Sequence, residues 1–180
     1  MDFELVYNNF FIIITGLDET LILVIISLSL GFIISIPFSI ARASSNKILS
    51  NSVYYYVFVI RGTPLLVQIY LIYFGLGTIP AVRESFLWIV LKEPFWCGVI
   101  ALVINTVAYT TEIFRGGIES VTKGQIESCK SLGMNKFTMY AKIILPCAFR
   151  QALPGYGNEM ILMVKSTSLI SLTTYMEMTG

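Results

Sequence analysis

The chain has 180 residues, of which 56% are hydrophobic and only 13% charged, and its net charge is +1. A soluble domain carries about 25% charged residues, so this composition excludes a chain that covers itself with polar surface and indicates a membrane protein. There is no histidine, and the three cysteines lack CxxC spacing, which argues against a Ser-His-Asp hydrolase, a zinc site and a disulfide framework. We therefore expect neither a metal nor a bound cofactor.

The N-terminal segment, residues 1–19, carries four acidic side chains and no basic one. A cleaved secretory signal begins with a positive segment, so we expect the first apolar run to remain in the protein as a membrane anchor.

Four stretches are long and apolar enough to cross a membrane, since a spanning helix needs about 20 mostly apolar residues. They cover residues 21–41, 53–76, 95–114 and 152–174. The second is interrupted at 61–64 by the sequence Arg-Gly-Thr-Pro. The fourth contains Asn158, Glu159 and Lys165 and is the least apolar.

The loop charges predict the orientation, because basic residues accumulate on the cytoplasmic side. The first loop holds Arg42 and Lys47 without an acid, the second is balanced, and the third, residues 115–150, has six bases against two acids. We therefore expect the N-terminus outside and the first and third loops in the cytoplasm. Four spans would end the chain outside after a polar stretch, so we expect a fifth span to be missing from this sequence. A genuine four-span protein is the alternative.

The third loop is predicted to begin with a short capped helix. Thr122 and Gln125 have the spacing of a capping box, in which each satisfies a backbone donor of the other. Cys129 and Leu132 recur three residues apart, which favours a shared apolar face. Gly133 is a natural residue to end the helix.

A second helix follows in the same loop. Asn135 can cap it, Phe137, Tyr140 and Ile144 share one of its faces, and Pro146 is expected to close the segment. Such a pair of short helices could lie on the lipid surface with its lysines toward anionic headgroups. It could equally insert into a cleft of a soluble protein, and the physical pattern alone leaves both interpretations open.

Glu127-Ser128-Cys129, Gly133 and Ile143-x-Leu145-Pro146 have a spacing that resembles the EAA signature of bacterial ABC importer membrane subunits. The two alanines of that signature are replaced by serine and cysteine, which are still small. Four further blocks are similar to those of polar amino acid permeases of the histidine/lysine-arginine-ornithine type, at 61–68, 105–115, 153–159 and 165–169. The resemblance extends over about residues 20–175.

This resemblance implies an all-α integral membrane protein of the bacterial inner membrane. Residues 1–180 would form one type I ABC importer transmembrane domain with a five-helix core, whose last helix is absent from this sequence. The function implied is that of a permease for polar or basic amino acids, and not of an enzyme. No GxxxxGK[ST] sequence is present, so ATP would be used by a separate subunit.

The resemblance also implies the partners. They are a cytoplasmic ABC ATPase dimer, a second permease subunit that is homologous or identical, a periplasmic or lipid-anchored amino-acid-binding protein, and membrane lipid, with no nucleic acid. In this family the third loop carries the coupling helix that docks on the ATPase. The matching positions are Glu127, Ser128, Cys129, Leu132 and Gly133. We expect the small apolar face of Cys129 and Leu132 to make the contact.

Polar residues inside the predicted spans are candidates for the substrate path, because a charge costs about 2.5–3.5 kcal/mol at a helix centre and usually faces a cavity or a partner. The candidates are Asn105, Glu112, Asn158 and Glu159. Two carboxylates suit a cationic amino acid, and the resemblance implies that Glu159 and Asn105 contact it. The alternative is structural pairing of Glu159 with Lys165 and of Glu112 with Arg115.

Arg61 lies near the inner end of the second predicted span, where a long side chain can reach the headgroups. We therefore interpret it as structural. Two other classes of function stay open: an ion-coupled secondary transporter, and an intramembrane enzyme or assembly factor, of which the enzyme is disfavoured by the missing histidine.

Overall fold

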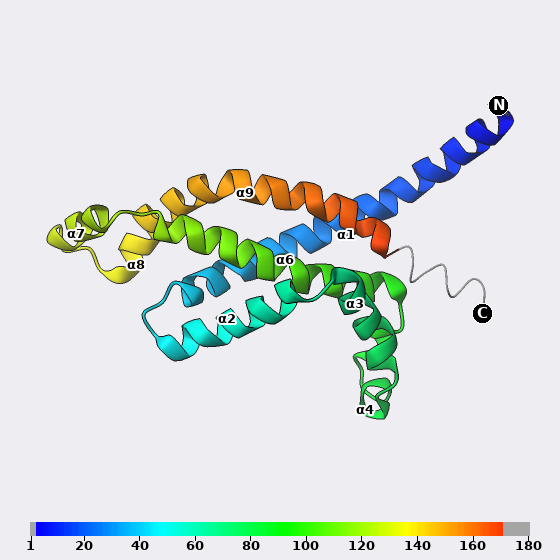
Figure 1. The fold of residues 1–180 in the computed structure, drawn as a ribbon, viewed down its shortest axis with the longest axis horizontal. Helices are drawn as coiled ribbons and strands as arrows, with labels where there is room; N and C mark the ends of the chain where they lie inside the picture. Colours follow the sequence, from blue (N-terminus) through cyan, green and yellow to red (C-terminus); the bar gives the residue numbers. More distant parts are fainter. Residues whose placement is uncertain (1–2, 171–180) are drawn as a thin grey trace.

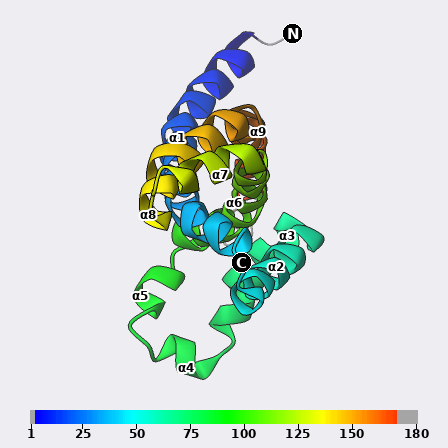
Figure 2. The same cartoon turned by 90° about the vertical axis from the view of Figure 1, so that its left-hand side faces the viewer.

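The central element of the fold is helix α6 (Pro94–Glu119), which packs most extensively against α1 (Phe3–Arg42) and α9 (Leu145–Ser166). This computed structural model describes residues 3–170, with side chains from residue 20 onward. The three helices form a bundle in both views (Figure 1, Figure 2). No strand occurs in this described range, so the predicted all-helical architecture is confirmed.

Helices α1 and α6 approach each other through small side chains. Ser27, Gly31, Ser35 and Ser39 recur every fourth residue and so share one face of α1, and the three serines are fully buried. A Cβ atom at Gly31 would lie 2.6 Å from the Thr106 methyl carbon. Such stripes let membrane helices come close enough for extensive van der Waals contact. The stripe therefore positions α1 against the helix that carries much of the candidate site.

The contact between α6 and α9 is closest at Gly117. A Cβ atom there would collide with the backbone carbonyl group of Ala148, which is itself fully buried. Backbone atoms cannot move aside as a flexible side chain can, so this position requires glycine. The neighbouring Gly116 has nothing within 4 Å of the position that a Cβ would take.

Gly117→Ala is expected to destabilise the protein by about 1–3 kcal/mol, the usual effect of overpacking. Gly116→Ala is the matched control, and it should be neutral or slightly stabilising because alanine favours a helix by about 1 kcal/mol over glycine. Thermal unfolding of the two variants in detergent compares them directly. Equal melting temperatures would contradict the close α6–α9 approach.

The stretch predicted as the second span is sharply bent. It forms α2 (Lys47–Gly62), α3 (Leu65–Tyr70) and the π-helix η1 (Leu71–Gly75), with an angle of 103° between the two parts. Pro64 lacks a backbone N–H and cannot continue α2, which explains the break. Beyond it α3 packs against α6 and contributes Ile69 to the core, and the chain then extends away from the bundle with the short helices α4 (Pro80–Arg83) and α5 (Trp88–Leu91) (Figure 2).

Two helical segments in the described residues are long and apolar enough to cross a membrane, Thr20–Arg42 and Pro94–Glu119, and the bent pair is a third candidate. The helix predicted at 95–114 continues to Glu119, because Arg115 pairs with acids three residues before and four residues after it. The fourth predicted span differs more. Its helix begins at Leu145, seven residues earlier than expected, and residues 171–174 lie outside the described part of the chain.

The third loop forms α7 (Lys123–Ser131), α8 (Lys136–Met139) and the π-helix η2 (Tyr140–Ile144) at one end of the bundle (Figure 1). The expectation that Pro146 closes this segment is wrong, because α8, η2 and α9 follow one another without a break, and a short 3₁₀ turn, η3 (Thr167–Leu169), ends α9. A proline inside a helix clashes with the carbonyl four residues back. The wider π turn directly before Pro146 accommodates it.

Candidate functional site

A cavity of about 460 Å³ lies where the bend after α2 faces α6 and α9. Its polar lining includes Arg61, Asn105, Tyr109 and Glu159. We call it the first cavity. Two of the four predicted substrate-path residues, Asn105 and Glu159, therefore face the same space although they come from different helices.

Gln68 connects the first cavity to the bend. Its amide nitrogen donates to the carbonyl oxygens of Ile60 (2.7 Å) and Thr63 (3.1 Å), at the end of α2 where carbonyls lack a helical partner. Its amide oxygen accepts from Asn105 Nδ2 at 3.2 Å. The same side chain thus holds the bend and orients Asn105, whose Oδ1 is left as the acceptor for a ligand.

Gln68→Leu is expected to lower the stability by about 1–3 kcal/mol, because it removes the side-chain donor of the Thr63 carbonyl and leaves the Ile60 carbonyl only the longer bond from Thr63 Oγ1 at 3.3 Å. Val67→Ala, at the neighbouring and 44% exposed position, is the control. Thermal unfolding in detergent is the measurement. If both variants melt at the same temperature, Gln68 does not hold the bend.

Glu159 is buried, with only 7% of its surface exposed, and lines the first cavity. None of the ion pairs or hydrogen bonds among the described residues involves its carboxylate, and Lys165, the partner considered from the sequence, is exposed. A buried carboxylate without a partner is unfavourable. In a membrane protein such a group usually marks a site that receives a ligand.

Among the described residues of this lining, Arg61 is the other charged one. Its interpretation from the sequence as a purely structural residue did not predict this place in the cavity. Its guanidinium carbon lies 4.8 Å from the centre of the Tyr109 ring, a cation–π contact that orients the side chain. The sequence signal was the break at Gly62 and Pro64. That signal predicts that the helix stops, but not that the turn brings Arg61 to face α6.

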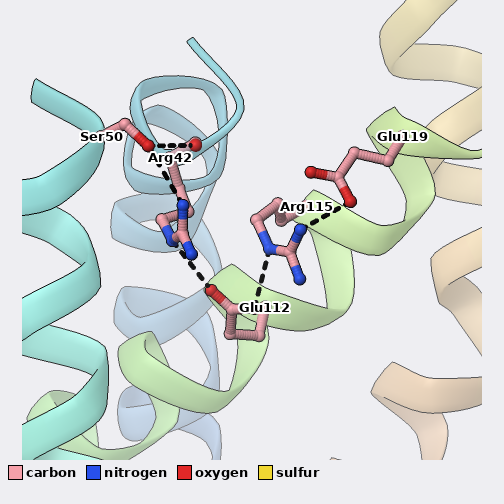
Figure 3. Close-up of polar contacts among 5 residues, drawn as sticks. All are labelled: Arg42, Ser50, Glu112, Arg115 and Glu119. Carbon is pink, nitrogen blue, oxygen red and sulfur yellow. Dashed lines mark hydrogen bonds and ion pairs between the residues drawn. The ribbon is translucent and has the colours of Figure 1, made fainter. Parts of the chain in front are cut away.

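The other two predicted path residues lie outside the first cavity. Asn158 is exposed and lines neither of the cavities described here. Glu112 forms ion pairs instead: its Oε2 accepts from Arg115 Nε at 2.7 Å, and its Oε1 lies 3.4 Å from Arg42 Nε (Figure 3). The structural pairing of Glu112 with Arg115, considered as the alternative, is therefore present.

This ion network joins three helices at the end of the bundle nearest α7. Arg42, the last residue of α1, donates from Nη1 to Ser50 Oγ of α2 at 3.1 Å, and that hydroxyl donates back to the Arg42 carbonyl at 2.8 Å. On α6, Arg115 Nη1 donates to Glu119 at 2.5 Å. Figure 3 shows the five side chains in one continuous row. The network ties the end of α1 and the start of α2 to α6.

The predicted start and end of α7 are confirmed. Thr122 Oγ1 accepts from the Gln125 backbone N–H at 3.4 Å, and Gln125 Oε1 accepts from the Thr122 N–H at 3.1 Å, which completes the capping box. Gly133 has a φ of +73°. The N–H of Met134 donates to the Cys129 carbonyl at 3.1 Å, and that of Gly133 donates to the carbonyl three residues back, as in a Schellman motif.

The expectation that Cys129 and Leu132 share one contact face is wrong. Cys129 is buried in a cluster that includes Val121 and Ala148, and so it fastens α7 to the bundle. Leu132 is the C-cap, where the chain turns away from the helix axis, and 76% of its surface is exposed. Glu127, Ser128, Leu132 and Phe137 are among the exposed residues of this region that are available to a partner.

The model of the family of binding-protein-dependent transport system inner membrane components matches residues 31–178. The chain belongs to this family. It is 48% identical over its whole length to the nopaline transport system permease protein of Agrobacterium fabrum, of which it covers 75%. It is 44% identical, over 89% of its length and 68% of the relative, to the histidine/lysine/arginine/ornithine transport system permease protein of Escherichia coli K12.

A solved structure described as an amino acid ABC transporter with histidines shares the fold, with a TM-score of 0.81 and 36% sequence identity. The match covers 97% of this chain and 77% of that one. The resemblance found in the sequence is thereby confirmed: this is the inner-membrane permease of a binding-protein-dependent ABC importer, and not a catalytic subunit. Its class implies an ATPase and a binding protein as partners, and excludes the secondary transporter, enzyme and assembly-factor interpretations.

Proposed function

We propose that this permease imports basic amino acids, or compounds such as nopaline, by binding them in the first cavity. The observation that carries the proposal is the unpaired carboxylate of Glu159 in the same lining as Arg61. A basic amino acid has a cationic side chain, an α-ammonium group and a carboxylate. Glu159 receives the side-chain cation and Arg61 the carboxylate.

The energetic argument concerns the buried carboxylate. Hydrogen bonds between charged groups are about twice as strong as neutral ones, and they gain further strength where water is excluded. Glu159 forms no ion pair or hydrogen bond in the described part of the chain and feels only the more distant charge of Arg61, so a ligand cation supplies a direct partner. Asn105 Oδ1 adds an acceptor on α6, oriented by the hydrogen bond from its amide nitrogen to Gln68.

The proposal includes the assembly. The domain adopts the type I importer arrangement with its N-terminus outside, and a second permease subunit, identical or homologous, completes the path. Leu132 and the exposed neighbours Glu127 and Ser128 dock on a cytoplasmic ATPase dimer, while Gly133 allows the turn that presents them. A periplasmic or lipid-anchored binding protein delivers the substrate. The basic residues of the first and third loops support this orientation.

The test is uptake by the complete complex in proteoliposomes across a panel of arginine, lysine, histidine, ornithine, nopaline, alanine and glutamate. We expect uptake of the basic compounds to require ATP and to survive an ionophore that collapses ion gradients. Preferential uptake of glutamate or alanine would contradict the proposed ligand class. ATP hydrolysis that no loaded binding protein stimulates would contradict the proposed assembly.

A further inference from the structure

A second cavity of about 360 Å³ adjoins the first and is lined by residues of α1, α2 and α6. Arg61, Gly62 and Tyr109 line both, so the two cavities are adjacent and share the wall that Arg61 forms. The second cavity extends to Arg42 and Glu112. It thus lies between the first cavity and the ion network of Figure 3.

The lining of the second cavity carries an excess of positive charge. Arg42 and Arg61 contribute two guanidinium groups against the single carboxylate of Glu112, and that carboxylate is already bonded to Arg115 through Oε2. Each guanidinium is held over an aromatic ring: that of Arg42 lies 5.0 Å from the centre of Tyr54, and that of Arg61 contacts Tyr109. Arg42 is partly buried, whereas Arg61 is exposed. Guanidinium groups that are oriented in this way are well suited to bind a carboxylate.

Two buried polar atoms at this cavity have no hydrogen-bond partner, Arg42 Nε and Glu112 Oε1. They lie 3.4 Å apart, in ion-pair range but without hydrogen-bond geometry. The ion pair compensates the two charges, but it leaves the hydrogen-bonding capacity of both atoms unused. The group that would satisfy both has an acceptor for the arginine and a donor for the glutamate, close together.

The head group of an α-amino acid has this composition, since its carboxylate and its ammonium are attached to one carbon. We propose that the second cavity is a transit subsite for the zwitterionic head group of the transported amino acid, with the carboxylate at Arg42 and Arg61 and the ammonium at Glu112. This inference rests on the proposed function. Transport needs sites that bind well enough to admit a ligand and weakly enough to release it to the next site. Arg61, shared by both cavities, allows the carboxylate to pass without losing its guanidinium partner.

The test is protection of introduced cysteines in the complete transporter in nanodiscs. In a Cys147→Ser background, which removes an exposed cysteine, Ser166→Cys reports on the first cavity and Phe58→Cys on the second. L-Arginine at ten times its Kd should slow the reaction of both cysteines with a small methanethiosulfonate reagent by about tenfold, because only about a tenth of the sites are then empty. Agmatine, which is arginine without its carboxylate, should protect only Ser166→Cys.

Arg42→Gln should abolish the protection at Phe58→Cys and leave that at Ser166→Cys, while Arg42→Lys should keep part of it. If Arg42→Gln does not assemble, the comparison of arginine with agmatine still shows whether protection at Phe58→Cys requires the carboxylate of the ligand. Protection by arginine at Ser166→Cys alone would overturn the second subsite and leave the proposed function intact. Protection at neither position would overturn both. Equal protection of Phe58→Cys by agmatine would overturn the role of the carboxylate.

Discussion

Glu159→Gln is expected to reduce ATP-driven uptake of arginine by about 100-fold. The substitution keeps the size of the side chain and removes the only acidic charge that the described residues place in the lining of the first cavity. Removing one partner of a buried charge pair costs about 2–5 kcal/mol, and each 1.4 kcal/mol is a factor of ten. Initial uptake rates in proteoliposomes that contain the complete complex give the measurement, with the melting temperature recorded beside them.

Asn158→Ala is the matched control for this experiment, since Asn158 is adjacent in the chain and exposed outside both cavities. We expect it to transport arginine at nearly the unaltered rate. The Glu159→Gln complex should also have a melting temperature at or above that of the unaltered complex, because the substitution removes a buried charge that forms no ion pair. Unchanged arginine uptake by Glu159→Gln would remove this residue from the substrate path.

Leu132→Asp is expected to separate the permease from its ATPase. Leu132 is 76% exposed at the end of α7, so the substitution should leave the fold intact. A few central residues of an interface contribute about 2 kcal/mol or more each, and placing a charge at such a position corresponds to about a 30-fold loss of affinity. Copurification of the ATPase in mild detergent and substrate-stimulated ATP hydrolysis should both fall.

Lys130→Ala provides the comparison for Leu132→Asp, because Lys130 is also exposed on α7 but contributes charge and no large apolar surface. It should copurify with the ATPase as the unaltered chain does. Full copurification and normal coupling in the Leu132→Asp complex would place the ATPase contact on another surface.

Features that depend on neighbouring residues could be predicted from the sequence. The capping box of Thr122 and Gln125 and the left-handed Gly133 depend on backbone groups only a few residues away. The cap at Asn135, whose Oδ1 accepts from the Thr138 N–H at 2.8 Å, is local in the same sense and is also confirmed. Intramembrane polarity pointed to Glu159 as a candidate, because a buried charge needs a reason wherever it lies, and the family resemblance added Asn105.

Features that depend on distant elements could not be predicted. The burial of Cys129 follows from where Val121 and Ala148 lie, and the spacing within α7 does not specify this. The place of Arg61 in the cavity follows from the direction of a 103° turn that the side chain of Gln68 holds. Periodicity gives the face of a helix but not the neighbour that the face meets.

The most direct test of this account is a cryo-EM structure of the complete transporter with the basic amino acid that it imports fastest. We predict ligand density in the first cavity, with the cationic group at Glu159, the carboxylate toward Arg61 and Asn105 Oδ1 within hydrogen-bond distance of the ligand. An empty first cavity in a map that shows the ligand elsewhere along the permease would contradict the central claim.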